Sequence, residues 1–505
     1  MTASFADSRP EHETMPTHKW LVAASVMLGA ILTNLDASIV NVALPYMQKS
    51  FGVGVDRITW VVTSYLVAVS VMLPMTGWTA ARVGRKRYLV TSVVLFVIAS
   101  TMCGLADGIN QLVVFRVIQG AAGAAMMPLS QAILLETFPP AEHTLAMTTF
   151  GMGMMVAPVL GPTLGGWITV HWSWRWNFYI NVPTGAMAAF MVYRFVHDPG
   201  YLRKQGGSGK VDYLGIVLIW LALGLFQIVL TRGGRAGWFV APWVRYLSTA
   251  SALSMVLLVV HELRFPEPIL DLRILKIFGF TLSVILLSLQ SLALFSINLL
   301  NPLFMETVLG YDAWKAGLAV APRGLGVIIA LIAVGQLSRR GFDMRRFVAA
   351  GFILAAYEVW QMSRWSLDVS MHAVLVPIFL FGMGLGAVFP TITALGIGQI
   401  RRERMGFAAS LFGMMVSAGA ATGIAVVTNA LTARHQFHQA SLYAHLPLLN
   451  ASKGVAVSTG MLGSQAWLLA YNDVYRALAV LVLSLAPWCM LLRRNSEGEA
   501  EALVE

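Results

Sequence analysis

The chain has 505 residues, of which 57% are hydrophobic and only 12% are charged. Soluble globular proteins carry about 25% charged residues, so this composition excludes an ordinary soluble domain and predicts a polytopic membrane protein. The net charge of +11 does not indicate nucleic acid binding, because the basic residues fall in short connections between apolar runs, as the positive-inside rule expects.

The N-terminal segment, residues 1–19, is polar and ends in Lys19. The apolar run that begins at Trp20 is too long for the core of a signal peptide and lacks a small-residue cleavage site. We therefore expect a cytoplasmic tail followed by a first membrane span. The two cysteines, Cys103 and Cys489, lie far apart in apolar runs, which argues against a disulfide framework, a zinc site and redox chemistry.

Apolar runs long enough to cross a bilayer, which takes about 20 residues, follow one another along the whole chain. Fourteen are expected, near residues 20–45, 58–77, 88–106, 111–135, 143–170, 176–196, 212–231, 241–261, 277–305, 313–337, 346–365, 371–396, 405–430 and 474–492. The ninth run contains Asn301-Pro302, where a helix break is expected because proline lacks a backbone donor. Lys and Arg are roughly twice as frequent in the connections on the N-terminal side of the membrane, which places both termini in the cytoplasm.

The order of runs and loops predicts two related halves. The basic loop 77–87 follows the second run, and a similar loop, 335–346, follows the tenth. We expect an all-α protein with a cytoplasmic tail, an N-terminal six-helix bundle, a linker with two inserted helices, a C-terminal six-helix bundle and a second cytoplasmic tail. These units cover residues 1–19, 20–196, 197–276, 277–492 and 493–505, and a long external loop is expected at 431–473.

An acidic residue, Asp36, lies inside the first run, where a charge costs about 2.5–3.5 kcal/mol on insertion scales. It precedes Pro45 by nine residues, or about 13 Å of helix. Arg116 lies roughly 8 Å into the fourth run from the same side of the membrane. The two side chains are therefore expected within reach, either as a static ion pair or as a carboxylate whose protonation alternates with substrate binding.

Two further acids are candidates. Glu306 follows Asn301-Pro302 near the outer end of the ninth run, where it would either line a cavity or lie at the membrane interface. Glu358 lies deeper, in the eleventh run, and a buried acid is a functional candidate although this helix need not face a cavity. The amides that we take as further candidates for the substrate cavity are Asn34, Asn41 and Gln119.

Small residues and prolines recur every four positions in the fifth run. They are Gly153, Ala157, Pro158, Gly161, Pro162, Gly165 and Gly166. Residues four apart share a helix face, so this is a smooth stripe that another backbone can approach closely. It serves helix packing alone, or its prolines form a bend used in alternating access.

Several segments resemble the major facilitator superfamily. The stripe 153–166 is similar to its antiporter motif, and the segment 35–45 resembles the first-span signature of the fourteen-span drug:proton antiporters of the EmrB/QacA type. Arg116-x-x-Gln119-Gly120-x-x-Gly123 matches the family's arginine motif, and shorter likenesses occur at 174–183, 271–273, 308–311, 404–406 and 470–473. The family's cytoplasmic loop motif normally has Asp where this chain has Ala81.

This resemblance implies a major facilitator fold and proton-driven export of hydrophobic or amphipathic compounds across a bacterial inner membrane. It implies Asp36 as the coupling carboxylate and Arg116 as its counter-charge or proton-relay neighbour, and we add Glu306 as a further candidate for proton coupling. The loop residues Gly77, Arg82, Gly84, Arg85 and Lys86 are expected either to gate the cytoplasmic side or only to set topology.

The long external connection is similar to that of relatives that work with a periplasmic adaptor protein and an outer-membrane channel. No catalytic triad, nucleotide-binding motif or zinc-protease pattern occurs in the sequence, so we expect a non-enzymatic protein without cofactor or metal, driven by the proton gradient. Two alternatives remain open, namely a dedicated exporter of one metabolite or antibiotic, and a membrane scaffold or sensor that no longer transports.

Overall fold

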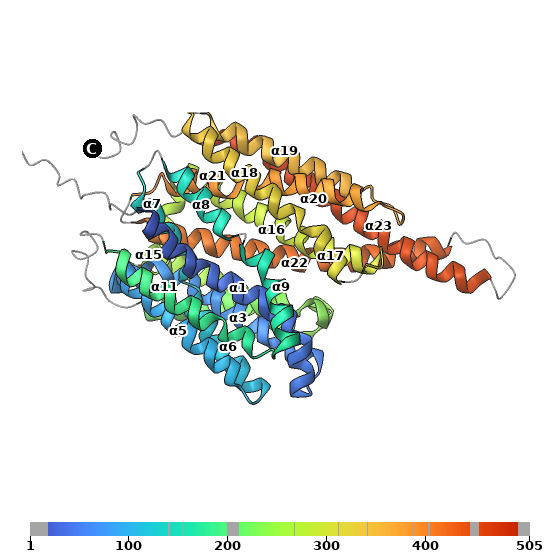
Figure 1. Ribbon diagram of the computed structural model, residues 1–505, viewed down its shortest axis with the longest axis horizontal. Coiled ribbons are helices and arrows are strands. Elements are labelled where there is room, and N and C mark those ends of the chain that lie inside the picture. The colour runs from blue at the N-terminus through green and yellow to red at the C-terminus, as the bar shows by residue number, and fades with distance from the viewer. Residues whose placement is uncertain are drawn as a thin grey trace, which may run out of the picture.

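The computed structural model describes residues 19–139, 142–154, 156–198, 212–266, 268–311, 313–340, 342–386, 388–401, 404–444 and 454–492. These residues form helices and short connections, which Figure 1 shows as two lobes lying side by side. The expected tails 1–18 and 493–505 and most of the linker 197–211 lie outside the described residues.

The N-terminal bundle forms most of the first lobe. Its helices are α1 (Lys19–Phe51), α2 (Val55–Ile58), α3 (Trp60–Met72), η1 (Leu73–Met75), α4 (Thr76–Val83), α5 (Arg85–Leu105), α6 (Ile109–Gly123), α7 (Met126–Thr137), α8 (His143–Met154), α9 (Val156–His171), α10 (Trp176–Tyr179) and α11 (Asn181–Phe195). Proline explains one of the interruptions, since the helix tightens into the short 3-10 turn η1 at Pro74. Gly84, with a φ of 92°, ends α4 in a conformation that glycine adopts without strain.

The C-terminal bundle forms the second lobe. Its helices are α16 (Phe278–Thr307), α17 (Ala313–Val320), α18 (Pro322–Arg339), α19 (Met344–Met362), α20 (Met371–Gly386), α21 (Val388–Ile397), α22 (Met405–Ala444), α23 (Gly454–Leu485) and η8 (Pro487–Leu491). The expected break at Asn301-Pro302 is wrong, because α16 continues through Pro302. The buried Asn301 accepts a hydrogen bond from the Tyr475 hydroxyl of α23 at 2.7 Å, which fixes the helix at this point.

Two inserted helical stretches pack beside the N-terminal bundle. They consist of α13 (Tyr213–Ile219), η3 (Trp220–Gly224), α14 (Leu225–Arg232), η4 (Gly234–Ala236), η5 (Trp238–Val240), α15 (Pro242–Arg264) and η6 (Leu272–Lys276). The middle segment η3 contacts α3, and a separate apolar cluster around Val71, Ile219 and Leu258 joins the insertion to the bundle.

Eleven helical stretches in the described part of the chain are long and apolar enough to cross a membrane. The other three expected spans coincide with helices as well, namely α8 with α9, α10 with α11, and α19. The chain is therefore a multi-pass helical membrane protein, and the total of fourteen spans stays a prediction.

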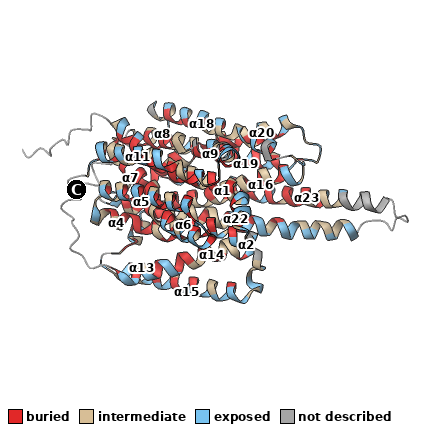
Figure 2. Cartoon of the chain, turned by 60° about the horizontal axis from the view of Figure 1, so that its bottom comes forward, coloured by how far each residue is buried: buried red, intermediate tan, exposed pale blue. Residues whose placement is uncertain are grey.

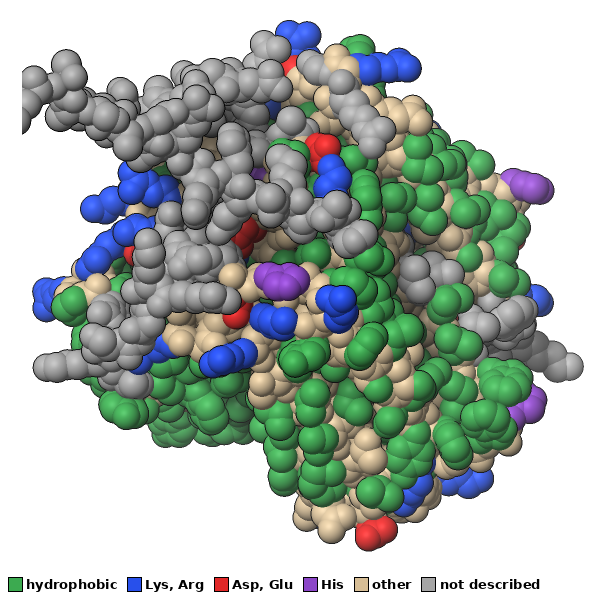
Figure 3. All heavy atoms as spheres, turned by 60° about the vertical axis from the view of Figure 1, so that its left-hand side comes forward, with side chains coloured by type: hydrophobic (Ala, Val, Ile, Leu, Met, Phe, Trp, Pro, Cys, Tyr) green, Lys and Arg blue, Asp and Glu red, His purple; other side chains and the backbone are tan. Residues whose placement is uncertain are grey.

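The two bundles contact each other toward one end of the molecule. We call the end at which α1 begins the basal end, and the opposite end, where α5 and α16 end, the distal end (Figure 1). Near the basal end, α4, η1 and α7 pack against α22, and α8 packs against α18 and α21. Lys and Arg side chains gather on the basal face, as Figure 3 shows.

At the distal end, α22 and α23 continue beyond the rest of the bundle as a two-helix arm, which we define as residues 431–444 and 454–473 (Figure 2). The segment 431–473 is therefore largely helical rather than an open loop. Asp473 of α23 holds the base of the arm together, because it accepts hydrogen bonds from Arg434 at 2.5 Å and from His438 at 2.7 Å.

Candidate functional site

The first helix places Asp36 inside the N-terminal bundle. One face of α1 packs on α9, α11 and α7, and Asp36 lies on a buried face with 0% of its surface exposed. Arg116 of α6 is 1% exposed, and its Nη1 donates to Asp36 Oδ2 at 2.6 Å. The structure thus brings together the two charges whose depths in the sequence suggested a contact.

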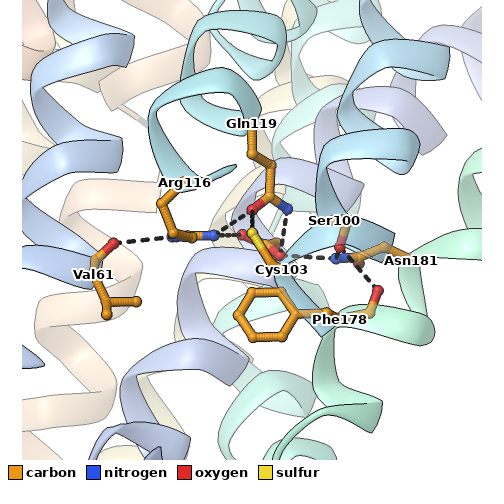
Figure 4. Close-up of polar contacts among 8 residues, drawn as sticks. Val61, Ser100, Cys103, Arg116, Gln119, Phe178 and Asn181 are labelled. Atoms are coloured by element: carbon orange, nitrogen blue, oxygen red, sulfur yellow. Dashed lines mark hydrogen bonds and ion pairs between the residues drawn. The ribbon is translucent and has the colours of Figure 1, made fainter. Parts of the chain in front are cut away.

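Two amides complete the carboxylate's surroundings (Figure 4). Gln119 Nε2 and Asn181 Nδ2 both donate to Asp36 Oδ1, at 2.9 and 2.8 Å. Gln119, a candidate for the substrate cavity from the sequence, is fully buried beside Asp36. Asn181 was not singled out from the sequence, although an amide inside an apolar run was a usable signal.

The outer contacts of this cluster hold each donor in place. Asn181 Nδ2 also donates to Ser100 Oγ at 2.9 Å, and Ser100 donates in turn to the Phe178 carbonyl oxygen at 2.9 Å. Arg116 donates through Nε to the Val61 carbonyl oxygen at 3.1 Å. We call Asp36, Ser100, Arg116, Gln119 and Asn181 the Asp36 cluster.

The Arg116 guanidinium is bound on several sides. Besides Asp36 and Val61, its Nη1 donates to Gln119 Oε1 at 2.8 Å, and its carbon centre lies 4.1 Å from the centroid of the Tyr65 ring. A cation over an aromatic face is stabilised by the ring quadrupole. Three donors, one of them charged, therefore converge on the Asp36 carboxylate.

The two other candidate acids lie in the C-terminal bundle. Glu306 is exposed on the last turn of α16, and Glu358 is buried in α19 with 3% of its surface exposed. The structure does not bring either acid to the Asp36 cluster. Asn34 is half-buried on α1 and donates to the Ala30 carbonyl oxygen at 3.1 Å, whereas Asn41, two turns further along, is exposed.

The small-residue stripe packs against α1 around Asp36. A Cβ at Gly161 would lie 2.4 Å from Ser38 Oγ, and a Cβ at Gly165 would lie 3.1 Å from the Ile39 Cα. Gly153 faces Met27 in the same way, Gly166 is in ordinary contact distance of Val42, and Ala157 is fully buried. Pro158 and Pro162 belong to α9, but their side chains lie outside the described residues.

The basic loop after the second span attaches to its own bundle through three residues. Arg85 pairs with Glu136 of α7, and the Lys86 backbone N–H donates to Asp198 Oδ1 at 2.8 Å. Gly84 faces the same carboxylate, since a Cβ there would lie 2.8 Å from Asp198 Oδ2.

The first glycine of this loop motif contacts the other bundle. A Cβ at Gly77 would lie 2.7 Å from the Phe407 Cα of α22, so α4 and α22 approach backbone to backbone. Arg82 stacks on the Trp78 ring at 4.4 Å. This arrangement lets Gly77 join the bundles at the basal end.

Known proteins resemble the chain over most of its length. The model of the Major Facilitator Superfamily matches residues 26–424. The multidrug export protein EmrB of Escherichia coli (strain K12) is 32% identical over 419 residues, which covers 83% of this chain and 81% of that protein. The fatty acid resistance protein FarB of Neisseria gonorrhoeae is 32% identical over 417 residues, covering 83% and 82%.

A solved structure has the same architecture. The human organic anion transporter MFSD10 (TETRAN) superposes with a TM-score of 0.65 at 14% identity, covering 93% of this chain and 99% of that one. At this identity the likeness concerns the fold alone.

Proposed function

This chain belongs to the major facilitator superfamily, and we propose that it is a proton-coupled exporter of hydrophobic and amphipathic compounds, a multidrug efflux transporter. The names of its relatives support export of many compounds, since the EmrB protein is 32% identical over 83% of the chain. The chain is a transporter rather than an enzyme, and it needs only the proton gradient as an energy source.

The observation that carries the proposal is the Asp36 cluster, a carboxylate at 0% exposure with one cation and two amides. A buried acid in a membrane helix is a candidate proton carrier. Its charge is costly at this depth, so acids in membrane spans are rare and usually have a functional role. One proton moving inward releases about 2.3 kcal/mol per 100 mV of membrane potential, in addition to the pH gradient.

Protonation would turn one oxygen of Asp36 from an acceptor into a donor. Asn181 Oδ1 is buried without a hydrogen-bond partner among the described residues, so a turn of this amide would offer the protonated carboxyl group an acceptor. Arg116 would then lose its counter-charge and depend on Gln119 and Val61. This exchange of partners is the step by which we propose that protonation reaches the packing of α1, α6 and α11.

Alternating access would follow from the contacts between the bundles. We propose that the basal contacts of α4 and α7 with α22 close the cytoplasmic side, and that export requires them to open and re-form. The basic basal face supports a cytoplasmic position for both termini. We place the protein in the bacterial inner membrane on the basis of its bacterial relatives.

A periplasmic partner is the second part of the proposal. The distal arm projects from the end opposite to the basic face, which would be the periplasmic side. We propose that the arm binds an adaptor protein that links the exporter to an outer-membrane channel. Deletion of the arm tip should abolish co-purification with the adaptor, and unchanged co-purification would count against this role.

A dedicated exporter of one chemical class is the alternative that a specific observation favours. The FarB protein is as similar to this chain as EmrB is, and its name refers to fatty acid resistance. A panel of cationic, neutral and acidic compounds separates the two, since a single exported class would replace the multidrug proposal. A scaffold without transport has no such support.

The decisive experiment uses the full-length chain in proteoliposomes with an imposed pH gradient. Asp36→Asn keeps the size of the side chain but cannot be ionised, so we expect proton-driven export to stop while the protein is still made and folded. Asp107→Asn is the matched control, because Asp107 is exposed at the distal end. Export by Asp36→Asn at the wild-type rate would refute proton coupling at this site.

A further inference from the structure

The C-terminal bundle contains a cation whose partner is not an acid. Arg323 lies on the first turn of α18 and is partly buried, and its Nη1 donates to Asn298 Oδ1 of α16. Among the residues that the structure describes, no carboxylate is paired with it. Arg116 in the N-terminal bundle, by contrast, is neutralised by Asp36.

This arginine is held at its base. A Cβ at Gly382 of α20 would lie 2.2 Å from the Arg323 carbonyl oxygen, so the backbones of α18 and α20 touch at this turn. The side chain then reaches across to α16. This backbone contact fixes the base of the side chain, and the hydrogen bond to Asn298 holds its guanidinium.

The two sites lie at comparable depths in the two halves of the chain, although Arg116 is on the fourth expected span of its half and Arg323 on the second. Asn298 lies on the first helix of its bundle, as Asp36 does, and nine residues before Thr307, or about 13 Å from the distal end of α16. Arg323 is ten residues from the start of α17, which amounts to about 15 Å of helix. Both therefore lie at a depth where a charge needs compensation.

The geometry of the Arg323 guanidinium indicates which kind of anion would pair with it. A guanidinium has five N–H donors in a planar fork, and the amide oxygen of Asn298 accepts from only one nitrogen. A carboxylate matches this fork with two parallel hydrogen bonds and supplies the absent negative charge. An ammonium group would be repelled.

We propose that Arg323, positioned by Asn298, binds the acidic group of amphipathic carboxylate substrates. This inference rests on the proposed export function and deepens it by naming a substrate class. Export of a monoanion in exchange for one proton moves two charges in the same electrical direction. A negative potential inside the cell would therefore drive acidic substrates more strongly than neutral ones.

Binding of two nearly isosteric probes tests the site. Equilibrium dialysis of the full-length protein in nanodiscs would compare 2-naphthoate with the neutral 2-naphthamide, after subtraction of empty nanodiscs. We expect Arg323→Gln to weaken naphthoate binding about tenfold or more, as loss of a charge-assisted hydrogen bond predicts, and to change amide binding less than about twofold. Arg323→Lys should retain only part of the naphthoate affinity, because it keeps the charge but loses the planar fork.

A second variant supplies the missing anion from the protein itself. Asn298→Asp places a carboxylate beside Arg323 and should abolish the preference for naphthoate, without loss of fold or of amide binding. Arg245→Gln, which removes an exposed charge from α15, is the control and should bind both probes as the wild type does.

Equal weakening of both probes by Arg323→Gln, or equal affinity of the wild type for both, would overturn the inference. Failure of the export function would appear separately, as absence of proton-driven transport in the proteoliposome assay whatever residue stands at 323. Naphthoate selectivity that survives Asn298→Asp would also overturn the proposed role of this pair.

Discussion

Replacing Gly77 by alanine should separate the two bundles at the basal end. A Cβ on this residue would lie 2.7 Å from both the Cα and the N of Phe407, which are backbone atoms and cannot turn aside. Forcing one extra methyl group into a packed contact costs about 1–3 kcal/mol. That penalty applies only while α4 packs on α22, so the equilibrium should shift about 5- to 150-fold away from this arrangement.

Distances between spin labels would measure this shift. One pair of labels at Val83 and Phe342 reports on the basal end, and a second pair at Leu105 and Leu318 reports on the distal end; all four residues are exposed. The native cysteines are both buried and so do not compete for the label. We expect the basal distances to lengthen and the distal distances to shorten in Gly77→Ala.

Gly317→Ala is the control for this experiment. Gly317 is also helical, but a Cβ there would meet no atom within 4 Å, so the same change should leave both distance distributions as in the wild type. Unaltered basal distances in a folded Gly77→Ala protein would show that the close approach of Gly77 to α22 does not hold the bundles together.

Two further predictions concern buried and distal ion pairs. Arg116→Gln leaves Asp36 buried without its cation, so the free energy of unfolding should fall by about 3–5 kcal/mol. Thermal unfolding in detergent would measure this loss. Adding Asp36→Asn to the same chain should restore most of the lost stability, and no recovery would contradict the pairing. Asp473→Asn removes the charge that accepts bonds from Arg434 and His438, so the backbone amides of residues 431–444 should exchange hydrogen faster, and unchanged exchange would mean that other contacts hold the arm.

The pairing of Asp36 with Arg116 could be predicted because it depends on few quantities. The rise of a helix converts sequence position into depth, and the cost of an unpaired charge in a membrane requires a partner. The family fold was recognisable for a related reason, since its motifs are short segments whose small and charged residues are fixed by close helix contacts.

The amides around Asp36 could not be placed in this way. Whether Asn181 turns toward α1 or toward lipid depends on the rotation of α11 about its axis, and one polar residue in an apolar helix does not determine that rotation. The same limit applies to Arg323, whose partner Asn298 becomes visible only when α16 and α18 are placed together.

Two local expectations failed for different physical reasons. Pro302 was expected to break α16, but packing against α23 maintains the helix. The hydrogen bond from the Tyr475 hydroxyl to Asn301 lies at this packing contact. The arm was expected as a loop because the segment 431–473 connects the last two apolar runs. The absence of Gly and Pro from residues 431–444 was the signal for a helix that the length of the segment obscured.

The continuity of α23 has a mechanical consequence. This helix of 32 residues joins the distal arm to the membrane part of the C-terminal bundle without an interruption, and at 1.5 Å per residue it is about 48 Å long. A stiff rod of that length that tilts by about 10° moves its far end by about 8 Å. A small tilt of α23 within the bundle would therefore displace a molecule bound at the far end of the arm by several ångströms. Conversely, a molecule that holds this end in place would oppose the tilt of the helix.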